Sequence, residues 1–533
     1  MLNFLPVLLI IITIIGLIVL RRMRTPIGTI WLILAVAGLL NWGSLLILRS
    51  HLPEALNIST WFPLSANADL LIFSISGNTW VLLFALASLL VGILFASSAH
   101  LSDANIFVTW FEVLFLTAVG MLSLLADSPL AFLLIWGMID IVEIVVFVII
   151  NRDLSFSVQS YAIIFSRALG LILVITAMAL SYQSQAPLEL AKASGAVLSL
   201  LIAGAGLRLG ALPVHLPYTR ELDNRRSMGT ILRMLAPLSV FSFLSKLAVP
   251  QTLTGTNFLI FLLAIISCLI GAINWFSAKN ELEGRPYWLL TFSGFALVSF
   301  LRGQSMSVLI WGVLMVVIGG WVFLSESHSK KLDILLPVAL LAVCGIPFTP
   351  ASIGFGGIST GSFAIINPLL WVSLAFLLAG MVKFSISGGD SQTPYENWMK
   401  LFYSIGMGLL VLSPWTIVLF KMKGWNQTQF WWECVISLIL FTVIILIKYS
   451  QPIRSRLLDS SVSNFTIAVT PFGKGINQFF HFNWVYKTIV FLFNIQKWIV
   501  EKLNLILEGE GGILWALVFL VLLVSLLVNG KSG

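Results

Sequence analysis

Residues 206–235 read GLRLGALPVHLPYTRELDNRRSMGTILRML and place Arg208 and Arg233 inside segments that are otherwise apolar. A charged side chain within a bilayer is costly, so such residues generally face the interior of a helix bundle or a wet cavity. Pro213 and Pro217 follow Arg208 closely and are expected to end or break its helix, because proline lacks the amide hydrogen that a helix requires. The stretch therefore predicts a membrane helix bundle with a broken helix beside a buried charge.

The composition of the whole chain also indicates a membrane protein. The chain has 533 residues, of which 59% are hydrophobic and only 10% charged, and its mean hydropathy is +1.02. These values lie outside the range of soluble globular domains. Backbone groups in lipid have no water to bond, so continuous apolar runs must be helical. We therefore expect an all-α polytopic transmembrane helix bundle of about 14 to 16 spans, since each span needs about 20 apolar residues.

Apolar runs bounded by charges, glycine or proline define the expected spans. The first series is 3–20, 28–48, 79–98, 106–126, 129–150, 158–182, 194–212 and 228–248. The second series is 257–277, 286–302, 306–325, 332–348, 367–386, 401–420, 429–447 and 511–529.

Residues 475–508, which precede the last expected span, are too polar to cross a bilayer. Polar side chains recur there at helical spacing between aromatic and aliphatic ones, which is typical of an amphipathic helix lying in the membrane interface. Such a lateral helix is either a peripheral anchor or a strut along neighbouring spans or a partner subunit.

Basic residues gather in alternate loops. The richer side contains Arg21, Arg22, Arg24, Arg152, Arg220, Arg225, Arg226, Lys279, Arg285, Lys330, Lys331, Lys400 and the stretch from Lys448 to Lys502. The positive-inside rule makes this side cytoplasmic, so both termini are expected on the outer face of a plasma membrane. The net charge of +8 thus reflects orientation in the lipid bilayer and does not indicate a nucleic acid partner.

No cofactor or metal is indicated by the sequence. Cys268, Cys344 and Cys434 lie far apart within apolar runs, without a CxxC pair or a nearby histidine cluster. The sequence also lacks a phosphate loop, zinc-ligand spacing, a haem ligand pattern and a nucleophile paired with a base. We therefore expect a chain with no catalytic redox site of its own.

Ionisable residues within the expected spans are the candidates for an ion pathway. Asp140 and Glu143 are three residues apart and share one helical face. They could accept and release a proton, or form fixed ion pairs with an arginine, and the sequence leaves both readings open. His215 lies in the expected break and either exchanges protons or serves as a structural hydrogen-bonding residue. The full set is Asp140, Glu143, Arg167, Arg208, His215, Arg233 and Lys383, with Lys246 near a span end.

Two residues and one further segment complete the pattern. Asp127 and Glu433 lie close enough to span ends to reach the interface, so we do not include them in the pathway. Residues 344–362, CGIPFTPASIGFGGISTGS, contain prolines and several glycines and predict a second interrupted helix, without any ionisable group.

Three of these motifs resemble the antiporter-like membrane subunits of respiratory complex I, membrane-bound hydrogenases and Mrp sodium/proton antiporters. Residues 206–217, with a cation seven residues before the histidine of PVHLP, resemble the broken seventh helix of that family and its P-x-H-x-W-L-P motif. IWGMIDIVE, which begins at Ile135, resembles the family's W-E-x-M segment, and residues 345–355 resemble its twelfth-helix break. The resemblance covers nearly the whole chain.

The resemblance implies a row of charged residues at the membrane midplane that passes protons. The family's lysine in span seven corresponds to Arg208, and its lysine or histidine in span eight corresponds to Arg233. Its span-five glutamate corresponds to Gly137, with Asp140 one turn on. Its span-twelve lysine falls near Phe355, which cannot ionise. Arginine in effect never gives up its proton in a protein, so these arginines can act only as fixed charges.

The resemblance also implies a division into inverted repeats. The expected parts are N-terminal spans at 1–98, antiporter-like repeats at 99–250 and 251–390, C-terminal spans at 391–450, the lateral segment at 451–510 and a final span at 511–533.

The implied function is that of a membrane subunit in a complex I-like or Mrp-like assembly that couples proton or sodium translocation to a partner's chemistry. Its expected partners are other membrane subunits and a soluble redox or zinc-containing subunit, as in an NADH:quinone oxidoreductase-type translocase. Two alternatives stay open: a non-conducting structural subunit, and a membrane partner in inorganic carbon uptake. An unrelated solute carrier is disfavoured, because no span offers a distinct polar substrate pocket.

Overall fold

A computed structural model describes most of the chain up to Tyr449 and isolated residues beyond it. The described ranges are 4–52, 54–58, 71–101, 105–150, 158–183, 188–216, 218, 226–250, 255–325, 334–359, 364–386, 396–421, 431–449, 491, 495, 498, 501–502, 518 and 521.

The chain forms two compact units. The first comprises Met1–Leu154 and Ile163–Thr466, and the second comprises Ser155–Ala162 and Ile467–Gly533. Few residues of the second unit are described, so the structure discussed below is that of the first.

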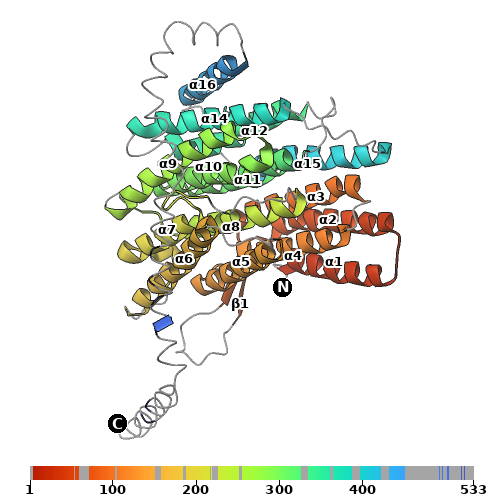
Figure 1. The fold of residues 1–533 in the computed structure, drawn as a ribbon, viewed down its shortest axis with the longest axis horizontal. Helices are drawn as coiled ribbons and strands as arrows, with labels where there is room; N and C mark the ends of the chain where they lie inside the picture. The colour runs from red at the N-terminus through yellow and green to blue at the C-terminus, as the bar shows by residue number, and fades with distance from the viewer. Residues whose placement is uncertain are drawn as a thin grey trace. The chain divides into compact units, whose positions relative to one another are not determined.

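Helices make up almost all of the described chain, and most of those in the first unit run alongside one another (Figure 1). The first group is α1 (Leu5–Arg22), α2 (Ile27–Leu48), α3 (Gly77–Ala96), α4 (Ile106–Leu125), α5 (Pro129–Ile150), α6 (Val158–Gln183), α7 (Gly195–Arg208) and α8 (Ser227–Lys246). The second group is α9 (Thr256–Ser277), α10 (Glu281–Leu301), α11 (Ser305–Leu324), α12 (Leu335–Val343), α13 (Ala351–Ser359), α14 (Asn367–Ile386), α15 (Asn397–Lys421) and α16 (Trp431–Tyr449).

Short elements join some of these helices. The antiparallel pair β1 (Glu54–Ile58) and β2 (Leu71–Ile75) lies between α2 and α3, with Glu54 opposite Ile75. The 3₁₀ helices are η2 (Arg49–His51), η3 (Ser97–His100), η4 (Leu190–Lys192) and η5 (Ala364–Ile366).

The predicted all-α polytopic bundle is confirmed. Every expected span from 3–20 to 429–447 has a helix in its place, and eleven helices of the described residues are long and apolar enough to cross a membrane. The expected lateral helix at 475–508 and the last span at 511–529 lie outside the described residues, apart from isolated positions.

The centre of the first unit is formed by helices that are buried on nearly all sides. The apolar windows of α3 and α11 are fully buried, and that of α8 nearly so. α3 packs against α2, α11 and α15, while α8 packs against α4 and α11. A helix without a polar face is stable only when it is surrounded by other helices or lipid.

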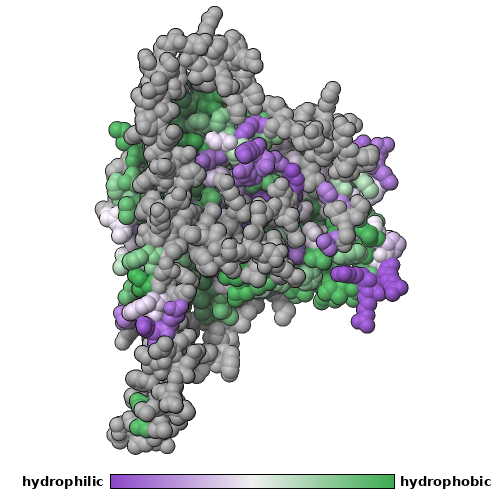
Figure 2. Space-filling view, in the orientation of Figure 1, coloured by the Kyte–Doolittle hydropathy of each residue, from purple (hydrophilic) through white to green (hydrophobic). Residues whose placement is uncertain are grey.

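Large apolar side chains also cover the outside of the first unit. Ile12, Leu40 and Ile47 are each more than 60% exposed, and Figure 2 shows apolar side chains on the described part of the visible face. A soluble domain of this size would bury such residues, so the exposed faces of α1 and α2 fit contact with lipid tails.

The chain is interrupted at both predicted breaks. α7 ends at Arg208, Gly210 has a φ of +76°, and the amide of His215 donates to the carbonyl oxygen of Gly210 at 2.8 Å. α12 and α13 are likewise separated by residues 344–350, where Gly345 has a φ of +80°. Glycine adopts this left-handed conformation without the steric cost of a Cβ atom, which permits the chain to turn sharply.

α8 differs from these two because it remains continuous through Pro237. Proline has no amide hydrogen for the carbonyl four residues earlier, so the carbonyl of Arg233 loses its usual helical donor. Arg233 thus lies one turn before a proline, as Arg208 lies shortly before Pro213, but Pro237 does not interrupt its helix.

Glycine permits the close contact of α9 and α10. A Cβ atom on Gly294 would lie 2.7 Å from both the carbonyl oxygen of Ala264 and the Oγ of Ser267, and would also meet the Cys268 sulfur. The backbone oxygen cannot move aside without shifting the helix.

We therefore expect Gly294→Val to lower the free energy of unfolding by about 1 to 3 kcal/mol or more, the usual cost of overpacking. Gly16→Val is the matched control, since a Cβ at Gly16 has nothing within 4 Å. Thermal unfolding of both variants in detergent tests this, and equal melting temperatures would contradict the packing.

Candidate functional site

A buried ion pair joins α5 to α7. The guanidinium of Arg208 donates to both carboxylate oxygens of Asp140, at 2.7 and 2.9 Å. It also lies 4.6 Å from the ring centroid of Trp136, which is one helical turn before Asp140. The side chain of Arg208 is 1% exposed, so the two-pronged contact with Asp140 provides its main electrostatic compensation.

A second set of ion pairs centres on Glu143. Its Oε2 accepts a hydrogen bond from Arg167 of α6 and lies 3.8 Å from Nη1 of Arg233 on α8. Arg167 also lies 3.5 Å from Oδ1 of Asp140, so it connects the two carboxylates. The five charged side chains therefore form one network that spans four helices.

The network holds an excess of positive charge. Asp140 and Glu143 supply two negative charges against the three of Arg167, Arg208 and Arg233, which leaves a net charge of +1 with both carboxylates ionised. Removing one partner from such a buried network generally lowers the free energy of unfolding by more than the intact pair contributes to it, because the other charge is left uncompensated.

Small residues allow α6 and α7 to approach closely enough for these contacts. A Cβ atom on Gly170 would lie 2.9 Å from Cγ of Arg208 and 3.0 Å from the carbonyl oxygen of Gly204. The aliphatic stem of Arg208 therefore lies in the space that a side chain at position 170 would fill.

Aromatic residues complete the surroundings of the network. The indole N–H of Trp136 donates to the Oγ of Ser239 on α8 at 2.6 Å, which fixes the ring that faces Arg208. The guanidinium of Arg233 lies 4.5 Å from the ring centroid of Tyr218, in the segment after α7. Contacts of this kind stabilise a desolvated cation.

His215 lies beside the network in the break after α7. Its Nδ1 is 2.6 Å from the carbonyl oxygen of Pro213, which can only accept, so Nδ1 carries a hydrogen. Its Nε2 is 2.9 Å from the hydroxyl of Ser166, the residue before Arg167. That hydroxyl also lies 2.9 Å from the carbonyl oxygen of Ile163.

The hydrogen bonds of His215 can be satisfied in either protonation state. In the neutral ring, the Ser166 hydroxyl donates to Nε2. In the charged ring, Nε2 donates to that hydroxyl, which turns to donate to Ile163 instead. Rotation of one hydroxyl therefore allows His215 to gain or lose a proton without leaving a polar group unpaired.

The structure brings together six of the seven residues that the sequence indicated, and Lys383 is the exception. Lys383 lies in the last turn of α14 and donates to the carbonyl oxygens of Phe276, at 2.9 Å, and Ala278 at the end of α9. Its role in an ion pathway stays a prediction.

The turns after α4 and α9 give a common reference for the two halves of the chain. α4 and α9 end next to Ala126 and Ala278, and α5 and α10 follow directly. Trp136 and Trp288 each lie ten residues after the corresponding alanine, and both are fully buried.

Counted in the same way, the charged residues of α5 correspond to aromatic ones. Asp140 corresponds to Phe292 and Glu143 to Phe295, and both phenylalanine rings are fully buried. The part of α10 that matches the ionic face of α5 is thus apolar.

The broken helices show the same contrast. Arg208 and Val343 are the last residues of α7 and α12, and a glycine with positive φ, Gly210 or Gly345, follows each by two positions. A Cβ atom at Gly345 would collide with the ring of Phe355, so the second break is filled by an aromatic side chain. The turn is similar in both halves, but its charge is present only in the first.

One polar network was only partly predicted by the sequence. Lys246, the last residue of α8, forms an ion pair with Asp127 at 3.4 Å. Asp127 lies at a span end and is therefore not among the expected pathway residues. A lysine in a final helical turn and an aspartate just after another helix are the signals for this pair, but sequence alone does not indicate that they meet.

Within the described ranges, no group of three or more His, Cys, Asp or Glu side chains is placed to hold a metal ion. The carboxylates of the site are instead matched to arginines.

No family model and no curated protein matches the sequence. The fold is nevertheless similar to that of a chain in the Mrp complex from Dietzia sp., with 13% identity and a TM-score of 0.66. This match covers 99% of the present chain and 63% of the other, so the present chain spans less than two thirds of that longer one.

Two other solved structures have a similar fold. A chain of the membrane-bound sulfane sulfur reductase, an archaeal respiratory membrane complex, is 14% identical with a TM-score of 0.64, covering 98% of this chain and all of that one. A chain of respiratory complex I from Thermus thermophilus is 16% identical with a TM-score of 0.60, covering 83% of this chain and all of that one. The fold that the motif resemblance implied is therefore confirmed.

A double variant tests the Asp140–Arg208 pair. Arg208→Met is expected to lower the free energy of unfolding by about 3 to 5 kcal/mol, because it leaves a buried carboxylate without its main partner. Adding Asp140→Leu should recover most of this loss. Thermal unfolding of the two single variants and the double variant measures the coupling, and strictly additive effects would contradict a direct pair.

Proposed function

We propose that this chain is a membrane subunit of a complex I-like or Mrp-like assembly and takes part in proton or sodium translocation coupled to a partner's chemistry. The observation that carries the proposal is the buried network of α5 to α8, beside the break that contains His215. Ionisable residues inside a membrane bundle generally mark ion pathways. The similarity of fold to a chain of an Mrp complex and a chain of respiratory complex I supports the same proposal.

The proposal gives the arginines and the exchangeable groups different roles. Arg167, Arg208 and Arg233 keep their protons and act as fixed charges. Asp140 is held by two hydrogen bonds from Arg208, whereas Oε1 of Glu143 is buried and accepts no hydrogen bond from the described part of the chain. Glu143 and His215 are therefore the groups to which the proposal assigns proton exchange.

We further propose that the chain consists of two repeats, at 99–250 and 251–390, of which the first contains the pathway. The corresponding helix ends, tryptophans and glycine turns support this division. The apolar residues at the matching positions of α10 and α12 support the restriction to the first repeat.

The remaining assignments follow from the same reading. The chain lies in the plasma membrane with both termini outward, contacts other membrane subunits, and leaves redox or other chemistry to a soluble subunit. The basic loops and the lack of a catalytic motif in the sequence support these assignments.

A structural subunit that has lost conduction is the second candidate. The apolar second half favours it, because a path confined to one repeat lacks the ionisable positions that the other repeat would add. The two candidates differ in a single measurable property, the ion flux that passes through this chain.

The test is made on the purified assembly, with its partner subunits, in proteoliposomes. Glu143→Gln keeps the shape of the side chain but removes its charge, and is expected to reduce coupled proton or sodium flux at least tenfold. Arg208→Ala should do the same by releasing Asp140. Flux is measured with a pH-sensitive dye and radioactive sodium while the partner's turnover is recorded.

Glu189→Gln provides the control, since Glu189 forms an exposed pair with Lys192. Its flux should equal that of the unaltered assembly. If Glu143→Gln and Arg208→Ala leave flux unchanged in an intact assembly, the conducting role is wrong and the structural one is supported.

A further inference from the structure

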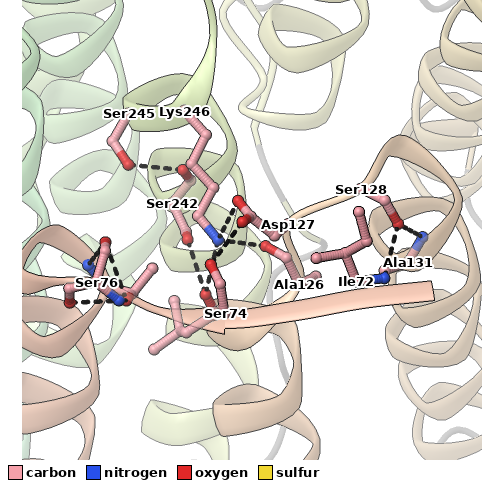
Figure 3. A network of polar contacts seen from close by, with 12 residues as sticks. Ile72, Ser74, Ser76, Ala126, Asp127, Ser128, Ala131, Ser242, Ser245 and Lys246 are labelled. Atoms are coloured by element: carbon pink, nitrogen blue, oxygen red, sulfur yellow. Dashed lines mark hydrogen bonds and ion pairs between the residues drawn. The ribbon is translucent and has the colours of Figure 1, made fainter. Parts of the chain in front are cut away.

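The ammonium group of Lys246 lies among oxygen atoms at the end of α4. Its Nζ donates to the carbonyl oxygen of Ala126 and lies 3.4 Å from both the carbonyl oxygen of Leu124 and Oδ1 of Asp127 (Figure 3). We call these three oxygens the α4 oxygen cluster. Two of them are backbone carbonyls, which cannot be protonated or withdrawn by side-chain rotation.

The α4 oxygen cluster is held in place by groups other than Lys246. The hydroxyl of Ser74 on β2 donates to Oδ2 of Asp127 at 2.6 Å, and the amide of Asp127 donates to the carbonyl oxygen of Ile72 at 2.9 Å. The hydroxyl of Ser242 donates to the carbonyl oxygen of Leu124 at 3.2 Å. These hydrogen bonds do not involve Lys246, so they remain available to hold Asp127 and the Leu124 carbonyl when the ammonium is removed.

The chemistry of the α4 oxygen cluster is that of a site for a hard monovalent cation. The carbonyls at a helix C-terminus lie at the negative end of the helix dipole. In membrane transporters, such helix ends and free backbone carbonyls coordinate Na⁺. Here a carboxylate adds a full negative charge, and its side chain is 35% exposed, whereas Leu124 and Ala126 are fully buried.

The end of α9 provides an internal comparison. Lys383 donates there to the carbonyl oxygens of Phe276 and Ala278, just as Lys246 contacts Leu124 and Ala126. However, the residue that follows Ala278 is Lys279, whereas Asp127 follows Ala126. Glu283 also acts electrostatically on the Lys383 ammonium, but it lies five residues beyond Ala278. At the α4 end the carboxylate belongs to the residue that directly follows the alanine and pairs with the ammonium at 3.4 Å.

We propose that Leu124, Ala126 and Asp127 form a binding site for a monovalent metal cation such as Na⁺, which the Lys246 ammonium fills in this conformation. The cation and the ammonium exclude each other, because both require the same three oxygens. Binding of the cation thus releases the end of α8, the helix that also carries Arg233. The site is defined by binding alone, so it does not depend on the proposed translocation.

The test uses the purified chain in detergent. Lys246→Ala removes the ammonium and leaves space beside Asp127. This variant is expected to melt about 2 to 4 °C higher in sodium chloride than in choline chloride of equal ionic strength, because bound Na⁺ stabilises the folded state. The unaltered chain should show a smaller shift, because its own ammonium competes for the same oxygens, and equilibrium dialysis with radioactive sodium should detect tighter binding in the variant than in the unaltered chain.

Two controls separate a specific site from a general effect of salt. Lys246→Ala combined with Asp127→Asn should bind no sodium, and Lys383→Ala should melt at the same temperature in both salts. Lys246→Ser repeats the test if the alanine variant does not fold. The proposal is wrong if the folded Lys246 variants retain no sodium, or if the shift persists without Asp127 or occurs equally in Lys383→Ala.

Discussion

The pairing of Asp140 with Arg208 is the interaction on which the ionic centre depends. Neither charge can remain alone inside a membrane bundle, because the cost of desolvation is met only by a close opposite charge. The two hydrogen bonds between them join α5 to α7 at the point where α7 ends. Glu143 and Arg167 extend the same compensation to α6, and Arg233 extends it to α8. Five charged side chains thus link four helices, and each of these charges depends on the others for compensation.

The two halves of the first unit have similar helix ends and turns but different buried side chains. Both halves have a turn after the corresponding alanine, Ala126 or Ala278, and a glycine with positive φ after the broken helix, Gly210 or Gly345. These features are alike because they determine the course of the backbone. Side chains that face the interior are under a different constraint, since an apolar ring fills space without needing a partner. Phe292 and Phe295 are fully buried and need no hydrogen-bonding or ionic partner. A carboxylate at either position would require a cation on a neighbouring helix.

The sequence was sufficient to predict the helices of the described residues up to Tyr449 and the two breaks, because hydropathy, proline and glycine act locally. It also identified the charged residues of the site. It could not predict that Asp140 meets Arg208 while Glu143 meets Arg167, because that depends on how each helix is rotated in the bundle. The pair of Lys246 and Asp127 was missed for a related reason: each lies at a helix end, where solvent usually compensates a charge.

The uninterrupted course of α8 through Pro237 has a mechanical consequence. Pro237 provides no amide hydrogen to the Arg233 carbonyl, and prolines are where long helices usually bend. Arg233 and Lys246 lie on opposite sides of this proline, and nine residues, or about 14 Å of helix, separate Pro237 from Lys246. A change of angle at the proline would displace Lys246 further than the residues between them, because the displacement grows with distance from the point of bending.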